Sequence, residues 1–340
     1  MATTSGASPQ TPAAKAPRQP VVVSTRVDKV STGARVASST RALIAVVIAF
    51  IMLIPVIWMA MTAFKTRPDA VAVPPIVFFE PSFEGFVSLL TSRRQLTTDE
   101  IEQYKQRTDL GWADQIALIR GQAITGPSAF PRQLLNSLII SSVSTVFSVG
   151  FGVLAAYAFS RFPVPGKDDL LFFILSQRML PPVVVTIPIF LMYRQVGLHD
   201  THLGMVLLYT AFNLSFSVWL LKGFIDEIPR EYEEAAMVDG YTRLQAFRKI
   251  VLPQATTGIA ATTVFSLIFS WNEYAFALML TSDVARTAPP SIPLVLGTGG
   301  IEWAAIAAGS LAFLVPVVIV TFLLRKHLLR GVTFGAIRKG

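Results

Sequence analysis

Six long apolar runs constrain the fold of this chain more than any other feature of its sequence. A helix needs about 20 consecutive apolar residues to cross the hydrocarbon core of a bilayer. Inside lipid, an apolar segment satisfies its own backbone hydrogen bonds by forming a helix. We therefore predict an all-α polytopic membrane protein with six transmembrane helices. The runs are Ala42–Ala63, Leu134–Phe159, Leu170–Met192, Leu203–Leu221, Gly258–Thr281 and Ala304–Leu324.

The composition supports a membrane protein. Charged residues make up 15% of the chain and hydrophobic residues 52%, whereas a soluble domain carries about 25% charge. The chain has no cysteine, which excludes disulfides and thiolate metal sites. Its net charge of +8 is spread around the apolar runs. This pattern indicates a lipid bilayer as partner and no nucleic acid.

The distribution of Lys and Arg predicts the orientation. With both termini on one side, that side carries eighteen of these residues and the other side ten. Eight of the ten lie in the long segment 65–132, and long loops cross membranes largely regardless of charge. We expect a multi-pass protein of the cell membrane with both termini in the cytoplasm.

These spans divide the chain into regions. We expect a flexible basic cytoplasmic tail, a first transmembrane helix, an extracytoplasmic segment, a five-helix core with a polar loop at 222–257, and a cytoplasmic C-terminal tail. Helical periodicity in Thr98–Arg120 predicts helix in the extracytoplasmic segment. Small residues at every fourth position of the second, fifth and sixth runs predict close helix packing. The regions are 1–41, 42–63, 64–133, 134–324 and 325–340.

The stretch Glu231–Pro253 is a polar segment between two apolar runs. We expect Asp226 to cap a helix whose first turn holds Pro229. Gly240 then allows a turn, and a second helix covers Thr242–Val251. The result is a helix–turn–helix at the membrane surface, with Ala235 and Ala236 forming a flat patch beside Arg243.

The order Glu234-Ala235-Ala236, then Gly240, then Leu252-Pro253 resembles the EAA loop of bacterial ABC importer permeases. The stretches AFPRQLLNSLIIS, WNEY and GVTFGAIRKG are similar to the carbohydrate-uptake permeases of this superfamily, in particular to the smaller permease subunit of maltose-type transporters. The resemblance covers roughly 42–340, with a longer outer segment at about 93–126. It implies the transmembrane domain of a type I ABC importer.

The resemblance also implies a function and a set of partners. The chain would be a non-catalytic permease subunit that moves a sugar, glycoside or polyol inward by alternating access. A separate ATPase dimer would hold ATP and Mg, so the chain itself would bind no cofactor. The transporter in the bacterial inner membrane would be completed by a second, non-identical permease and by a periplasmic or lipid-anchored solute-binding protein. The implied ATPase-coupling residues are Glu234, Ala235, Ala236, Asp239, Gly240, Arg243 and Pro253.

Arg178 lies near the middle of the third apolar run, just before Pro181 and Pro182. The prolines predict a break in the helix, and carbonyls freed at the break would stabilise the cation. Arg178 and Gln177 then either line a solute pathway or form a structural feature of the break.

Other polar residues near the apolar runs suit a sugar pathway, because aromatic faces and amide or carboxylate groups match sugar C–H faces and hydroxyls. Trp and Tyr also anchor helices at membrane interfaces, and Glu273 is a potential ion-pair partner of Arg178. The last outer loop offers contacts for a solute-binding protein, as the resemblance implies. The pathway candidates are Asn213, Trp271, Asn272, Glu273 and Tyr274, and the outer-loop candidates are Glu302 and Trp303.

Motifs for catalysis or metal binding are absent from the sequence. It contains no P-loop and no HExxH pair. Two other classes of function stay open from the residues alone. One is a self-contained secondary transporter or channel that uses intramembrane Arg178 and Glu273, and the other is a membrane scaffold or sensor without flux.

Overall fold

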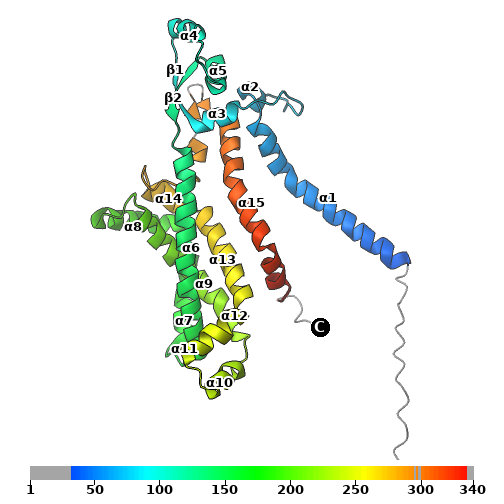
Figure 1. The fold of residues 1–340 in the computed structure, drawn as a ribbon, viewed down its shortest axis with the longest axis vertical. Coiled ribbons are helices and arrows are strands. Elements are labelled where there is room, and N and C mark those ends of the chain that lie inside the picture. Colours follow the sequence, from blue (N-terminus) through cyan, green and yellow to red (C-terminus); the bar gives the residue numbers. More distant parts are fainter. Residues whose placement is uncertain (1–31, 295, 298–299, 335–340) are drawn as a thin grey trace, which may run out of the picture. The chain divides into compact units, whose positions relative to one another are not determined.

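The computed structural model describes residues 32–294, 296–297 and 300–334, with side chains at 40–293 and 300–323. Contacts divide the chain into two compact units, Met1–Ile54 and Pro55–Gly340. The chain is mainly helical (Figure 1). Within the described residues, four helices are long and apolar enough to cross a membrane, and two bent helix pairs raise the number to as many as six. The predicted fold class is confirmed.

Five long helices dominate the structure. Of these, α1 begins ten residues before the predicted span, so Thr32–Arg41 are helical and only 1–31 of the expected tail lie outside the described residues. No proline interrupts Thr32–Arg41, so the helix extends beyond its apolar part. The helices are α1 (Thr32–Ala63), α6 (Phe130–Arg161), α9 (His202–Asp226), α13 (Thr256–Trp271) and α15 (Trp303–Phe334).

Residues 64–129 form an α/β lobe at one end of the helices of the second unit (Figure 1). Its strands β1 and β2 pair antiparallel, with Thr91 opposite Pro127 and Gln95 opposite Gln122. The helical content predicted for Thr98–Arg120 is confirmed in α4 and α5, whereas the strand pair was not predicted. The elements are α2 (Arg67–Ala70), α3 (Glu84–Leu90), β1 (Thr91–Gln95), α4 (Thr98–Lys105), α5 (Trp112–Ile119) and β2 (Gln122–Pro127).

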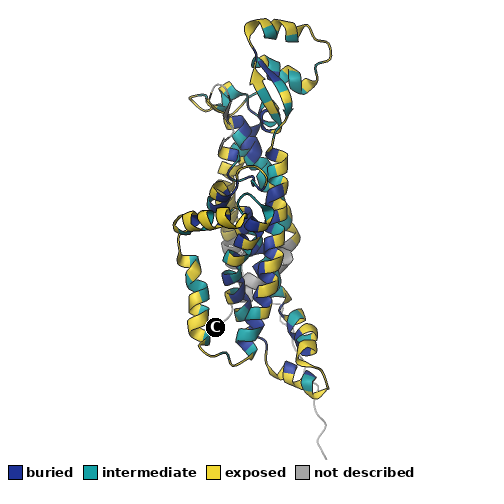
Figure 2. Cartoon of the chain, turned by 90° about the vertical axis from the view of Figure 1, so that its left-hand side faces the viewer, coloured by how far each residue is buried: buried dark blue, intermediate teal, exposed yellow. Residues whose placement is uncertain are grey.

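Close packing of α6, α9 and α13 forms the centre of the bundle, and Figure 2 shows buried residues along its interior. A Cβ on Gly152 of α6 would lie 2.6 Å from the Cβ of Ser217 in α9. Small side chains therefore bring these backbones together, as the sequence predicts. The small residues buried in this way include Ser144, Ser148 and Gly152 of α6, Gly258, Thr262, Ser266 and Ser270 of α13, and Ala304 and Ala308 of α15.

The third apolar run is a broken span. It consists of α7 (Lys167–Ser176), the 3₁₀ turn η1 (Gln177–Met179) and α8 (Pro182–Val196), and the two halves meet at 94°. Leu180 is extended, with ψ 125°, because a residue that precedes proline avoids helical backbone angles. The break predicted from the prolines is confirmed.

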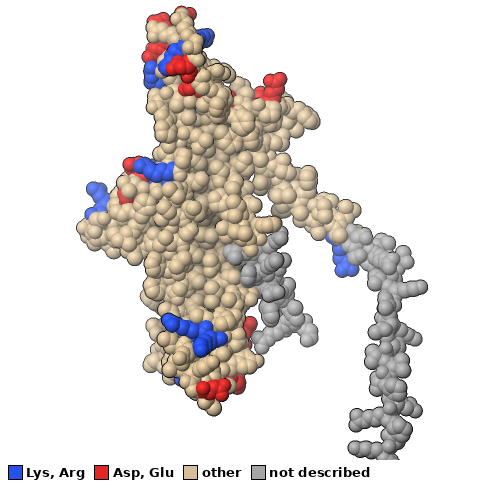
Figure 3. All heavy atoms as spheres, viewed as in Figure 1, with Lys and Arg blue, Asp and Glu red and all other residues tan. Residues whose placement is uncertain are grey.

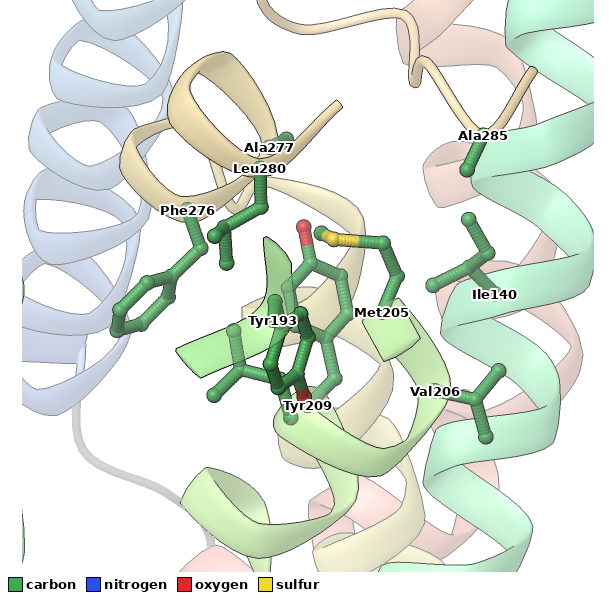
Figure 4. Packing of buried hydrophobic residues seen from close by; sticks show 10 residues of the cluster. Ile140, Tyr193, Met205, Val206, Tyr209, Phe276, Ala277, Leu280 and Ala285 are labelled. Carbon is green, nitrogen blue, oxygen red and sulfur yellow. The ribbon is translucent and has the colours of Figure 1, made fainter. Parts of the chain in front are cut away.

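An apolar cluster holds α8 in place beside α6, α9 and the short helix α14 (Ala275–Leu280) (Figure 4). Tyr193 of α8 is buried there, and its hydroxyl donates a 2.9 Å hydrogen bond to the carbonyl of Gly204. Met205 and Leu280 are almost fully buried in the same cluster. The second half of the broken span is therefore fixed to the bundle.

The fifth apolar run differs from the prediction of one continuous helix over Gly258–Thr281. Helix α13 ends at Trp271, and α14 begins only at Ala275. The side chain of Asn272 donates to the carbonyl of Ile268 at the end of α13, and Glu273 accepts from backbone amides at the start of α14. Because these polar groups satisfy both helix ends, the chain breaks inside an apolar run.

A group of short helices lies at the opposite end of the bundle from the lobe (Figure 1). The stretch Arg243–Gln254 meets α13 at 71°. Around Pro253 the helix widens into a π turn, in which the Leu252 amide donates to the Phe247 carbonyl. The wider turn accommodates a proline that lacks an N–H. These elements are α10 (Glu231–Val238), α11 (Arg243–Ala246), η2 (Phe247–Val251) and α12 (Leu252–Gln254).

The remaining elements precede α15. They are η3 (Ile292–Leu294), β3 (Leu296–Gly297) and β4 (Gly300–Ile301). Charged atoms on the face shown in Figure 3 gather at the lobe, near the tip of α8 and around α10, with a broad uncharged surface between them. This arrangement fits a bundle whose middle lies in hydrocarbon.

Candidate functional site

Helix α10 is held against the end of α6 by one buried carboxylate. Glu233 is 5% exposed. It accepts a 2.9 Å hydrogen bond from the Tyr157 hydroxyl and forms an ion pair with Arg161. Arg161 also donates to the Ile228 carbonyl at 2.8 Å. The buried pair thus ties α10 and the turn before it to a long helix of the bundle.

Further contacts complete this attachment. The Arg230 guanidinium donates to the Ser160 carbonyl at 2.7 Å. The Phe247 ring packs on the Tyr157 ring, with 4.5 Å between centroids. Both rings belong to a buried cluster that also includes Leu221 of α9. The short helices are therefore packed as one piece with α6 and α9.

The turn after α10 has the form that the sequence predicts. Gly240 has φ +90°, which glycine adopts without steric cost. Thr242 caps α11 through a capping box with Gln245, so the predicted start of the second helix is confirmed. The predicted cap at Asp226 is wrong. Asp226 ends α9, where it pairs with Lys222. Helix α10 begins at Glu231 after Arg230, whose side chain makes no cap, so Pro229 lies before the helix and not in its first turn.

The outer face of this helix–turn–helix is exposed, and the predicted coupling residues divide between that face and the interior. Glu234 and Ala235 point outward, whereas Ala236 is 6% exposed and packs inward. The predicted flat patch thus has only Ala235 at its surface, because neighbours in a helix point about 100° apart. Large apolar side chains extend the face. The exposed residues are Tyr232, Val238 and Leu244, together with Asp239, Gly240, Arg243 and Pro253.

Arg178 lies at the break of the third span. Its Cζ is 4.4 Å from the ring centroid of Phe269 and 5.3 Å from that of Phe216. Its buried Nη1 has no hydrogen-bond partner among the described residues. The Arg178 guanidinium is therefore stabilised by aromatic rings and not by the carbonyls that we expected, because the face of an aromatic ring attracts a cation.

A hollow of about 780 Å³ opens beside this arginine. Gln177 and Arg178 both line it, as a pathway would require. Most of the remaining wall is apolar and comes from α7, α8 and α9. It includes Phe173, Leu180, Val184, Ile189, Phe212 and Ser215.

Glu273 does not pair with Arg178 among the described residues. Its carboxylate accepts a 2.8 Å bond from the Tyr209 hydroxyl and bonds from the amides of Phe276 and Ala277 at 2.9 and 3.0 Å. The carboxylate thus caps α14 and fastens it to α9. This arrangement does not support a secondary transporter or channel in which Arg178 and Glu273 act together.

The other pathway candidates are not gathered at one site. Trp271 is 3% exposed and stacks on Phe313 at 4.8 Å. Asn213 is buried and donates to the Ser270 hydroxyl at 2.7 Å. Both therefore pack between helices. Asn272 and Tyr274 are exposed.

Glu302 and Trp303, the candidates in the last outer loop, differ in availability. Glu302 is 2% exposed and accepts two bonds from Arg120, at 2.8 and 2.6 Å. Burial alone would raise the pKa of Glu302, but the hydrogen bonds and charge of Arg120, with charges from Arg93 and Arg67, outweigh burial and lower the pKa. Glu302 is thus bound to Arg120 within the chain and is not free to contact a binding protein, whereas Trp303 is 48% exposed.

Comparison with known proteins places this geometry in a family. Residues 148–333 match the model described as the binding-protein-dependent transport system inner membrane component. The match covers more than half of the chain. The chain belongs to this family of transport permeases.

Comparison with individual relatives supports this family assignment. The permease is 30% identical to a probable ABC transporter permease protein, y4oR, of Sinorhizobium fredii, over 86% of this chain and 92% of the relative. It is also 30% identical to the trehalose/maltose transport system permease protein MalG of Thermococcus litoralis, over 86% and 94%. Identity is 36% with the trehalose transport system permease protein SugB of Mycobacterium tuberculosis, over 62% and 77%.

The fold of the permease is found among solved transporters. A bacterial ABC transporter that imports the acidic polysaccharide alginate aligns with a TM-score of 0.60 and 20% identity, over 87% of this chain and 98% of that chain. A second structure, of the alginate transporter with a pentasaccharide-bound periplasmic protein, aligns with a TM-score of 0.53 and 17% identity, over 85% and 93%. At these identities the likeness establishes the fold.

Several functional residues of the permease escaped the sequence analysis. The sequence analysis assigned no role to Glu233 or to Arg161. Their pairing joins positions 72 residues apart, so no local pattern reveals it. An acidic side chain on the inward face of an amphipathic helix was the one available signal, since buried charges require partners. Among the described residues, no three His, Cys, Asp or Glu side chains gather as a metal site.

Proposed function

We propose that this permease is the coupling partner of a separate ATPase dimer and moves a carbohydrate into the cell by alternating access. The observation that carries the proposal is the attachment of α10. The helix presents Glu234 and Ala235 to the exterior, while Glu233 on its other face is buried against Arg161 and Tyr157. A coupling helix needs an exposed face that binds the ATPase and a rigid connection to the membrane helices that it moves.

Motion of α10 has two direct routes into the bundle. The first route is the ion pair between Glu233 and Arg161 at the end of α6. The second is the continuous stretch of α11, η2 and α12, which leads into α13 through the 71° bend. Displacement of α10 by an ATPase would therefore tilt α6 and α13 together. ATP and Mg would stay on the ATPase.

Three further observations support this assignment. The apolar residues Tyr232, Val238 and Leu244 of the helix–turn–helix are exposed, and exposed apolar groups are typical of interaction surfaces. The Lys and Arg distribution favours cytoplasmic termini, which places α10 on the side where ATP is available. Relatives named as trehalose and maltose permeases favour a sugar, glycoside or polyol as cargo.

The remaining partners follow from the same reasoning. A solved neighbour in the comparison contains a periplasmic protein bound to a saccharide, which favours a solute-binding protein above this permease. Trp303, the first residue of α15, is half exposed and is the side chain that we assign to its contact. A second, non-identical permease would complete the pathway.

Purification from the native membrane tests the proposal. The tagged chain is extracted gently, and its companions are identified by mass spectrometry. The purified assembly is then placed in liposomes with the co-purified binding protein, and labelled sugars and glycosides, both neutral and acidic, serve as probes. We expect an ATPase and a second permease to be recovered, and uptake to require ATP. Recovery of the chain alone, with flux in ATP-free liposomes, would contradict the proposal.

A further inference from the structure

The Arg178 guanidinium is a cation that its own chain leaves without an anion. It lies over Phe269 and Phe216, which belong to α13 and to the middle of α9. Among the described residues no carboxylate lies within ion-pair distance of it. An Arg at the centre of a membrane-spanning segment is energetically costly. Such a residue faces a bundle interior or a water-filled cavity and marks a pathway.

The surroundings of the guanidinium leave its hydrogen-bonding edge unused. Phe rings attract the guanidinium as a cation but offer no oxygen or nitrogen acceptor, so its N–H groups remain available to one. Nη1 is buried and has no acceptor among the described residues. A planar fork of N–H donors matches two oxygens of one anionic group.

The adjoining hollow has the size and surroundings for a solute. Its volume is about 780 Å³, within the range of about 300–1,000 Å³ of ligand sites. Val184, in the first turn of α8, lines the hollow. Ser176, the last residue of α7, lines it as well, so the positive end of α8 and the negative end of α7 offset each other and Arg178 supplies the net charge. Gln177 lies beside the arginine in the lining and is available to sugar hydroxyls.

Lipid is a poorer occupant than solute. The Arg178 guanidinium packs on Phe216, fourteen residues from the start of α9 at His202 and ten from its end at Asp226. That depth is remote from headgroups at either surface, so an anionic headgroup would not reach the cation. An acyl chain would leave the charge uncompensated, which a medium of low dielectric penalises.

We propose that Arg178 binds an anionic oxygen group of the transported solute, so that the cargo is an acidic glycoside with a carboxylate or sulfonate. The inference rests on the carbohydrate import proposed above and narrows its substrate class. Gln177 binds hydroxyls of the same solute, and Phe269 and Phe216 hold the guanidinium in place. A neutral sugar would leave the cation without a counter-charge during passage.

Two probes of equal size test the inference in the complete transporter. 4-Nitrophenyl β-D-glucuronide carries a carboxylate, and 4-nitrophenyl β-D-glucoside does not. ATP-dependent uptake of each is measured with the wild-type chain, Arg178→Gln and Arg178→Lys. Since a solute-binding protein also selects its solute, the measured quantity is the ratio of variant to wild-type uptake for each probe.

We expect Arg178→Gln to lower glucuronide uptake about 10- to 100-fold, the effect of losing hydrogen bonds to a charged group. Glucoside uptake should change less than about threefold on the same reasoning. Arg178→Lys, which keeps the charge but not the fork, should give an intermediate ratio. Co-purification of the ATPase verifies assembly, and if Arg178→Gln fails to assemble, the comparison of probes in Arg178→Lys decides.

Two results would overturn the inference while carbohydrate import stands. One is equal loss for both probes in a variant that assembles, and the other is wild-type uptake of the glucoside alone. Wild-type uptake of neither probe would count against the carbohydrate proposal itself.

Discussion

Arg120 and Glu302 are 182 residues apart in the chain and share two hydrogen bonds, of 2.8 and 2.6 Å. Arg120 follows α5 in the lobe, and Glu302 directly precedes α15. Arg120 also pairs with Glu84 at 3.0 Å. The lobe is therefore fastened to the start of a membrane-spanning helix, and a force on the lobe reaches α15 through a buried ion pair.

Removal of the charge of Glu302 should destabilise the permease. Glu302→Gln removes one of the two carboxylates that pair with Arg120 and leaves Glu84 as its remaining anion, so we expect a loss of about 1.5–3 kcal/mol, as for hydrogen bonds between charged groups. Thermal unfolding of the purified protein measures the loss. The matched control is Asp109→Asn, since the pair of Arg107 and Asp109 is exposed, and exposed pairs contribute little to stability. Equal melting temperatures for Glu302→Gln and the control would show that the pair does not fasten the lobe.

Asp200 predicts a dependence of stability on pH. Burial would raise the pKa of its carboxyl, but hydrogen bonds from the amides of Ser282, Val284, Ala285 and Asp283 outweigh burial and lower the pKa to about 2. The ordinary pKa is about 3.9. Because the folded pKa is the lower one, the contribution is complete above about pH 5 and is lost as pH falls towards 2.

Amide exchange at Ser282–Ala285 measures the effect of Asp200. After correction for intrinsic exchange, protection should fall between about pH 4 and pH 2 in the wild type. Asp200→Asn should give low protection at every pH. A wild-type profile that is flat over this range would disprove the role of Asp200.

Gly152 and Gly150 of α6 offer a matched pair for testing the close helix packing. A Cβ at Gly152 would lie 2.6 Å from the Cβ of Ser217, whereas a Cβ at Gly150 would meet nothing within 4 Å. We expect Gly152→Ala to destabilise the bundle by about 1–3 kcal/mol through overpacking. Gly150→Ala should be neutral or stabilising by up to about 1 kcal/mol, since Ala favours helix. Thermal unfolding compares the two, and indistinguishable melting temperatures would contradict the packing.

The ion pair that attaches α10 to α6 should be needed to couple ATP hydrolysis to solute import. Glu233→Gln replaces the anion that pairs with Arg161 and leaves that cation buried, so α10 should move without carrying α6 with it. We expect the solute imported per ATP hydrolysed to fall about tenfold, as for a loss of about 1.4 kcal/mol. The control is Glu231→Gln, because Glu231 is exposed on the same helix. Normal uptake per ATP in Glu233→Gln would exclude Glu233 as the connection.

The sequence predicts those features whose cause is local. Pro181 and Pro182 directly cause the break of the third span, and Gly240 with Thr242 specifies the turn and restart after α10. The break of α13 was missed because apolar residues continue on both sides of Asn272 and Glu273. That break depends partly on the Tyr209 hydroxyl, which lies 64 residues away from Glu273.

In the candidate site, too, the sequence predicted only what depends on neighbouring residues in the chain. Exposure of Glu234 follows from helix periodicity, but burial of its neighbour Glu233 depends on Arg161 in another helix. The engagement of Glu302 by Arg120 likewise requires the folded lobe. Long-range ion pairs of this kind have no signature in a single sequence, because either partner alone is compatible with an exposed surface.

Cross-linking from α10 tests the central claim most directly. The chain has no cysteine, so Ala235→Cys introduces a unique thiol on the exposed face of α10, and Gln106→Cys introduces one on the exposed surface of the lobe. Each variant is purified with its partners and treated with a short thiol-to-amine cross-linker. We predict that Ala235→Cys cross-links to an ATPase and that Gln106→Cys does not. Cross-linking of the ATPase from the lobe, or from neither position although the ATPase co-purifies, would contradict α10 as the coupling helix.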